Sequence, residues 1–97
     1  MPRAATYLVC YDVTEDRERN RVAKVVEGYG LRIQFSVFEC RLSRSALAEL
    51  RRRLEVLELT TGSVAICRLD DRARRHQVGT PHTAEALAGS TTHCLLV

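Results

Sequence analysis

The stretch that decides the fold is Tyr7-Leu8-Val9-Cys10-Tyr11-Asp12-Val13, a continuous apolar run that ends abruptly at a carboxylate. Apolarity without alternation is typical of a strand that is buried on both faces. Helices of the same chain would cover one face. We infer that a second copy of the chain covers the other face in a symmetric dimer. Asp12 would then lie at the rim of the sheet on a rigid backbone.

A helix is predicted after this strand. Thr14 is a suitable N-cap, and Glu15 and Asp16 would lie in the first turn, where acidic side chains interact favourably with the helix dipole. Gly28 and Gly30 would end the helix, because glycine tolerates the left-handed conformation found at helix C-termini. The apolar residues recur on one helical face, namely Val22, Val25, Val26 and Tyr29.

Residues 32–42 alternate between apolar and polar side chains. Eleven residues exceed the usual strand length of about 5–6, so we predict two strands joined near Val37 and Phe38. A second helix is predicted to begin at Ser43 or Ser45, and a last core strand to span residues 63–69. The second helix would turn four leucines inward, namely Leu47, Leu50, Leu54 and Leu57.

The predicted order is strand, helix, strand, strand, helix, strand, which is the α+β ferredoxin-like arrangement βαββαβ. In this fold two helices cover one face of an antiparallel sheet. We predict one domain over residues 1–80 and a C-terminal tail over residues 81–97. Residues 76–80 are a candidate short strand, and residues 94–97 would dock on the dimer partner or be disordered.

The length of 97 residues suits a single domain. No apolar run approaches the roughly 18–20 residues needed to cross a membrane, and the N-terminus lacks the pattern of a signal peptide. We therefore expect a cytoplasmic protein with no membrane partner. The four cysteines are interpreted as small apolar core residues, with a metal or disulfide role as the alternative: Cys10, Cys40, Cys67 and Cys94.

The formal net charge is only +3, but fourteen of the fifteen cationic residues are arginine. The planar guanidinium group matches phosphate oxygens in a bidentate manner. An arginine bias also arises from a GC-rich genome, so charge alone is weak support for a phosphate partner. Arg19 and Arg21 flank the buried stripe of the first helix, and Arg32 opens the second strand. These positions fit a phosphate-binding surface or simply a solvated one.

Asp12 has two interpretations from its position. It is a candidate cap for the following helix. It is also a candidate ligand for a hard cation, because Mg²⁺ takes one or two carboxylates, several waters and substrate phosphate oxygens. One aspartate per chain is too few for a strong site, whereas two copies brought together across a dimer axis are sufficient.

Four blocks of the sequence resemble the second CRISPR-associated protein family, the small homodimeric proteins of CRISPR adaptation. The blocks fall in that family's order and spacing, and the resemblance covers about residues 5–70. They are Tyr-Leu-Val-Cys-Tyr-Asp-Val at 7–13, Arg-Asn-Arg-Val-Ala-Lys at 19–24, Gly-Tyr-Gly at 28–30, and Arg-Ile-Gln-Phe-Ser-Val-Phe-Glu-Cys at 32–40.

The resemblance implies a ferredoxin-like homodimer that packs sheet against sheet. It implies that Asp12 faces its counterpart across the two-fold axis and binds a divalent cation, Mg²⁺ or Mn²⁺. The family's functional positions that match here are Tyr11, Asp12, Ser36 and Phe38 at the catalytic site and Arg19, Arg21 and Arg32 at the nucleic-acid-binding surface. After residue 80 no family motif matches.

Two functions follow as hypotheses. In the first, paired Asp12 carboxylates hold a metal that cleaves phosphodiester bonds in RNA or DNA. In the second, which we place slightly ahead, the dimer grips double-stranded DNA and docks the CRISPR integrase during spacer acquisition, as part of antiviral defence. A toxin-type ribonuclease of the same fold is the alternative.

Overall fold

The computed structural model describes residues 3–69, Val78 and the backbone of residues 91–96. Within these residues, two helices and five strands follow one another. They are β1 (Ala4–Val13), α1 (Asp16–Val26), β2 (Gly30–Gln34), β3 (Val37–Ser43), α2 (Arg44–Glu55), β4 (Gly62–Leu69) and β5 (Thr91–Leu96). The predicted order of the first six elements is confirmed.

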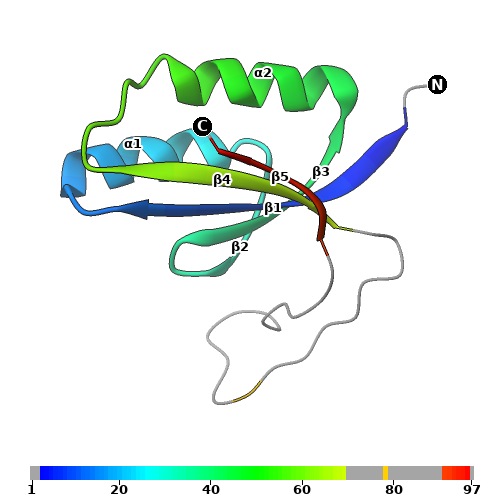
Figure 1. Ribbon diagram of the computed structural model, residues 1–97, viewed down its shortest axis with the longest axis horizontal. Coiled ribbons are helices and arrows are strands. Elements are labelled where there is room, and N and C mark those ends of the chain that lie inside the picture. The colour runs from blue at the N-terminus through cyan, green and yellow to red at the C-terminus, as the bar shows by residue number, and fades with distance from the viewer. Residues whose placement is uncertain (1–2, 70–77, 79–90, 97) are drawn as a thin grey trace.

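The strands form one antiparallel sheet in the spatial order β2-β3-β1-β4-β5. The first four have the ferredoxin-like order, with β1 in the centre, and this fold prediction is confirmed. Both helices lie on the same side of the sheet (Figure 1). The strand β5 extends the sheet at the edge of β4, so residues 91–96 pair with a strand of their own chain.

The core lies between the helices and one face of the sheet. Alternate residues of β1, beginning with Val9, point into it and meet the apolar stripes of the helices. Leu50 and Leu54 of α2 are fully buried, whereas Leu47 and Leu57 are partly buried against the same core. The core comprises Val9, Tyr11, Val13, Val22, Ala23, Val26, Phe38, Cys40, Leu42, Leu50, Leu54, Val64 and Ile66.

The opposite face of the sheet carries the other half of β1. Leu8 and Cys10 are half-buried and Asp12 is exposed, between the buried Val9 and Val13. The apolar run at residues 7–11 therefore has one covered face and one open face within a single chain. Because successive side chains of a strand alternate, Asp12 shares the open face with Leu8 and Cys10.

Two boundaries differ from the sequence prediction. The predicted N-cap Thr14 is wrong, because Glu15 caps α1 and its carboxylate accepts hydrogen bonds from the N–H groups of Arg17 and Glu18 at 3.0 Å each. The junction between the two middle strands is a turn at Phe35 and Ser36, two residues earlier than predicted. Phe35 is consequently 71% exposed instead of lying in a strand.

The cysteines do not share one role. Cys10 and Cys40 are free thiols, and Cys40 is a core residue as predicted. Cys67 is disulfide-bonded, so the core-filling interpretation is wrong for this residue. The residue opposite Cys67 in the register of β4 and β5 is Cys94, and the two strands place these positions directly across from each other.

Neither described helix has the length and apolar character needed to cross a membrane. The predicted strand at residues 76–80 lies outside the described residues, apart from Val78, which belongs to no helix or strand.

Candidate functional site

A pocket of about 390 Å³ lies at the C-terminal end of β1, where the chain turns toward α1. The turn between β2 and β3 forms its other side. It therefore joins segments that are more than twenty residues apart in the sequence. Four of the seven predicted site residues line it, and the full lining is Tyr11, Asp12, Val13, Thr14, Arg19, Phe35 and Ser36.

Asp12 presents an exposed carboxylate at this pocket. Its backbone is held in the sheet, where Asp12 pairs with Ser63 and Val13 pairs with Gly62 of β4. Because Glu15 caps α1, the helix-cap interpretation of Asp12 is wrong. The carboxylate is thus available for a ligand, and it stands at the edge of the open face of the sheet.

Tyr11 is a positioning residue beside Asp12. Its ring is buried, its hydroxyl donates a hydrogen bond to the carbonyl oxygen of Phe35 at 3.4 Å, and its backbone N–H donates to the carbonyl oxygen of Ser36 at 3.1 Å. Burial raises the pKa of the Tyr11 phenol, although the positive charges of Arg32 and Arg19 oppose the shift. The phenol therefore stays protonated at neutral pH, and its hydrogen bond to Phe35 ties the 35–36 turn to β1.

Arg19 reaches from α1 to the end of β1. Its guanidinium group donates hydrogen bonds to the carbonyl oxygens of Val13 at 3.0 Å and Thr14 at 3.3 Å, and it forms an ion pair with Asp16. It also lies 5.9 Å from the ring centroid of Phe35. Through these contacts Arg19 fixes the backbone that follows Asp12, while part of its side chain lines the pocket.

The other three predicted residues do not line this pocket. Phe38 is buried and stacks on Tyr11 with ring centroids 6.3 Å apart, so it supports the site from within the core. The guanidinium group of Arg32 lies over the Phe38 ring, 5.1 Å from its centroid, and pairs with Glu27 at 3.7 Å. Arg21 is exposed on α1.

Glu18 supports the site, although the sequence did not predict it as a site residue. Its carboxylate accepts four hydrogen bonds, from the backbone N–H and hydroxyl groups of Thr60 and Thr61, at 2.6–3.0 Å. These bonds, those of the Thr61 hydroxyl first, lower the pKa of Glu18 to about 2. Thr61 in turn contacts Thr14 and Glu15, so Glu18 holds the loop before β4 against the end of β1. In the sequence, the pair of adjacent threonines before Gly62 was the feature that could have indicated a partner for a carboxylate.

A divalent cation fits this pocket only as half of a site. The donor set includes one carboxylate, Asp12, and the pocket is also lined by the hydroxyl-bearing residues Ser36 and Thr14. In the part of the chain that the structure describes, no three acidic, histidine or cysteine side chains gather as a metal site. Mg²⁺ needs few protein carboxylates, because it retains several waters and binds substrate phosphates. Two chains that cover each other's open face would supply a second Asp12.

A model of the family described as CRISPR associated protein Cas2 matches residues 5–77 of this sequence. The chain belongs to this family. The match begins at the second residue of β1 and runs beyond β4, so it includes all the elements that build the pocket. The resemblance seen in the sequence blocks is thereby confirmed.

Curated relatives in the family carry nuclease names. The chain is 52% identical over 48 residues to the CRISPR-associated endoribonuclease Cas2 3 of Synechocystis, covering 50% of this chain and 52% of that protein. It is 41% identical over 70 residues to the CRISPR-associated endoribonuclease Cas2 2 of the same organism, covering 70% and 75%. The chain spans about half the length of the first of these curated relatives.

Solved structures in the family have the same fold. The chain superposes on a crystal structure described as cas2 with a TM-score of 0.74 and 31% identity, covering 88% of this chain and 98% of that one. For the Streptococcus pyogenes Cas2 crystal structure at pH 6.5, the TM-score is 0.60 with 29% identity, covering 69% and 88%.

Proposed function

We propose that this chain acts as a homodimeric, metal-dependent endonuclease on nucleic acid in a CRISPR system. The observation that carries the proposal is the position of Asp12, an exposed carboxylate on the open face of the sheet, at a pocket that Tyr11, Arg19 and Ser36 also line. The names of the relatives favour RNA as the substrate. The family match favours this function over a toxin-type ribonuclease. The cytoplasmic location stays a prediction.

Each residue would have a defined task. Asp12 of each chain would bind Mg²⁺ or Mn²⁺, which when bound activates water and offsets charge on the scissile phosphate. Arg19 would hold the backbone that follows Asp12 in place. Its remaining guanidinium N–H groups would donate to a phosphate group. Tyr11 and Phe38 would keep the 35–36 turn in place, so that the Ser36 hydroxyl remains beside the carboxylate.

The test is cleavage of labelled single-stranded RNA and double-stranded DNA with Mg²⁺ or with chelator. We expect Asp12→Asn to lower cleavage at least about 100-fold, because it removes the charged metal ligand while preserving its size. Glu55→Gln is the matched control, since Glu55 is an exposed carboxylate on α2 far along the chain from the pocket. Equal cleavage by the Asp12→Asn variant and wild type sinks the assignment.

A second candidate function is the bridging role in spacer acquisition, in which the homodimer binds double-stranded DNA and an integrase. Exposed arginines on α1 favour it. Arg17 and Arg21 are exposed, and neither forms an ion pair with another residue that the structure describes. Spacer acquisition in cells separates the two functions. If Asp12→Ala preserves acquisition and Arg21→Glu abolishes it, bridging is the biological role.

A further inference from the structure

A second pocket, of about 280 Å³, lies at the opposite end of β1 from Asp12. It opens between the start of β1, the end of β4 and the first turn of α2. Among the described residues, its lining consists of three arginines, one tyrosine and three aliphatic residues, namely Arg3, Ala4, Ala5, Tyr7, Leu42, Arg44 and Arg68. We call this feature the arginine pocket. Ala4 lies eight positions before Asp12 along β1, which places the arginine pocket roughly 25 Å from that carboxylate.

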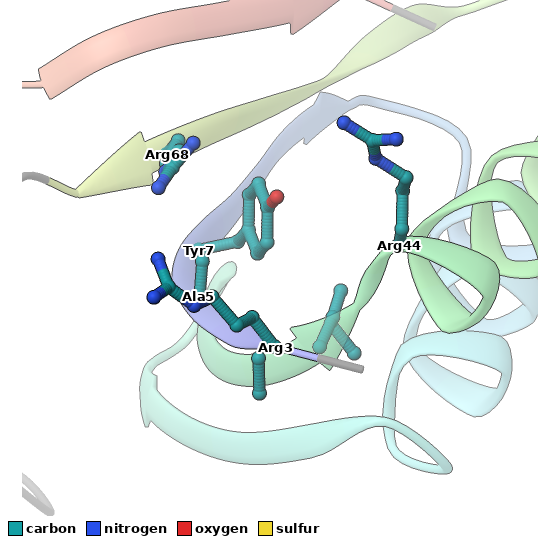
Figure 2. A pocket seen from close by; sticks show the side chains of 7 residues that line it. Arg3, Ala5, Tyr7, Arg44 and Arg68 are labelled. Carbon is teal, nitrogen blue, oxygen red and sulfur yellow. The ribbon is translucent and has the colours of Figure 1, made fainter. Parts of the chain in front are cut away.

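The three guanidinium groups come from different parts of the chain and surround one ring. Figure 2 shows Arg3 and Arg68 on one side of Tyr7 and Arg44 on the other, with the Tyr7 hydroxyl directed toward the Arg44 side. Tyr7 is half-buried and packs against the core, so it forms a fixed wall. Three cations held around a rigid ring repel one another unless an anion lies between them.

In the part of the chain that the structure describes, no carboxylate forms an ion pair with the arginines of the pocket. Arg3, Arg44 and Arg68 form no ion pair with any other residue that the structure describes, whereas Arg19, Arg32 and Arg51 each have a carboxylate partner. The fixed donors of arginine match the oxygens of a phosphate group.

The start of α2 is a separate indication of an anion. Arg44 is the first residue of the helix, and no acidic residue lies in its first turn. A cation at this end opposes the helix dipole. Helix α1 shows the favourable pattern, with Asp16 and Glu18 in its first turn and Lys24 in its last. An anion in the pocket would interact favourably both with Arg44 and with the positive end of α2.

We propose that the arginine pocket binds a phosphodiester group of a nucleic-acid strand, as a second contact site at the far end of β1. This inference rests on the proposed action on nucleic acid and adds the path of the strand, which would contact both ends of β1. At 3.4 Å per base pair along the helix axis, two points about 25 Å apart lie roughly seven base pairs from each other.

The experiment measures the affinity of the whole chain for a labelled 20-base-pair DNA duplex and for an RNA strand, in chelator, at a series of salt concentrations. Arg44→Ala/Arg68→Ala is compared with Arg51→Ala/Arg52→Ala. Both double variants remove two positive charges, but the control arginines lie on the exposed middle of α2, outside the pocket. Unfolding temperatures confirm that both variants fold.

We expect the pocket variant to bind roughly tenfold more weakly near 0.1 M salt, because charge-assisted hydrogen bonds are lost. For duplex DNA, the slope of log affinity against log salt concentration should fall in magnitude by about 0.9 for each phosphate released. The control should change neither. Tyr7→Phe, which keeps the ring, should weaken binding less than the double variant. A slope equal to that of the control overturns the proposal.

A titration with inorganic phosphate, followed through the Nε–H resonances of arginine by NMR, identifies the source of the phosphate. Stronger shifts with duplex or RNA than with phosphate at equal phosphate concentration support the proposal, and the reverse order overturns it in favour of a small-anion site. The outcome is separable from the nuclease proposal. If Asp12→Asn cleaves as well as wild type while the pocket variant binds more weakly, only the nuclease proposal is refuted. If Asp12→Asn loses cleavage while the pocket variant binds as its control does, only the arginine-pocket proposal is refuted.

Discussion

At the scale of single residues, Glu18 explains how the site is held in place. Its four hydrogen bonds join α1 to the loop before β4, and that loop contacts Thr14 just beyond Asp12. The ionised carboxylate accepts all four bonds, whereas a protonated or amide side chain presents a donor to at least one of the same N–H or O–H groups. Glu18 therefore stabilises the fold mainly in its charged form.

This charge preference predicts a pH dependence of stability. The pKa of Glu18 falls from 4.5 to about 2 on folding, so the stabilisation is complete above pH 4.5 and is lost as the pH falls toward 2. We expect Glu18→Gln to lower the free energy of unfolding at pH 7. The difference in unfolding free energy between the variant and wild type should become smaller between pH 4.5 and pH 2. Urea unfolding at several pH values measures it.

Glu55→Gln is the control for this experiment, because Glu55 is exposed and its carboxylate makes a single, long ion pair with the described residues, to Arg51 at 3.9 Å. The unfolding free energy of this variant should differ little from that of wild type at every pH. A gap for Glu18→Gln that stays constant down to pH 2 contradicts the role of the charged carboxylate.

At the scale of elements, the pairing of β1 with β4 fixes the position of Asp12. Gly62 lies opposite Val13, and a Cβ atom at Gly62 would overlap the carbonyl oxygen of Asp12. The two backbones approach this closely only because position 62 has no side chain. Glycine is required at position 62 because the paired strands leave no space for a side chain there.

We predict that Gly62→Ala lowers the free energy of unfolding by about 1–3 kcal/mol, the usual range for a side chain forced into filled space. Because the displaced atoms belong to Asp12, Asp12-dependent cleavage should fall as well. Thermal unfolding and the cleavage assay measure the two effects.

Gly28→Ala is the matched control, since a Cβ there would meet only the carbonyl oxygen of Val25 at 3.5 Å, an ordinary contact. It should leave both stability and cleavage close to wild type. Equal effects of the two glycine substitutions would refute the close approach at Gly62.

At the scale of the whole molecule, the open face of the sheet is the feature that calls for a partner. Leu8 and Cys10 are half-buried on this face in a single chain, and Asp12 stands at its edge. A second copy on this face would bury the apolar side chains and bring the second carboxylate toward the first. The dimer and the metal site are thus one proposal.

We predict that Leu8→Arg prevents formation of the proposed dimer, because it places a charge on the open face of the sheet, which the second copy would bury. Light scattering coupled to size-exclusion chromatography measures the mass. Cleavage that depends on Asp12 should be lost together with the dimer. Val56→Arg is the control, since Val56 is 72% exposed at the end of α2 and away from this face. A Leu8→Arg variant that remains dimeric contradicts the sheet-to-sheet arrangement.

The order of the elements could be predicted from the sequence, because apolar periodicity reports which side of each segment is buried. The leucines of α2 and the strand that ends at Asp12 could be located in this way. Predictions of helix caps were less accurate, because neighbouring polar residues compete for the same role. Thr14 and Glu15 are both plausible caps in the sequence, and Glu15 forms the cap while Thr14 bonds to the Thr61 carbonyl oxygen across the fold.

Only the tertiary structure decided what lies beside Asp12 and what lies at the other end of β1. The first pocket joins Asp12 to Ser36, and the arginine pocket joins Arg3, Arg44 and Arg68. These residues are far apart in the chain and belong to elements with ordinary local patterns. Sheet register and helix packing set their proximity, and both are determined by the whole core rather than by any one segment.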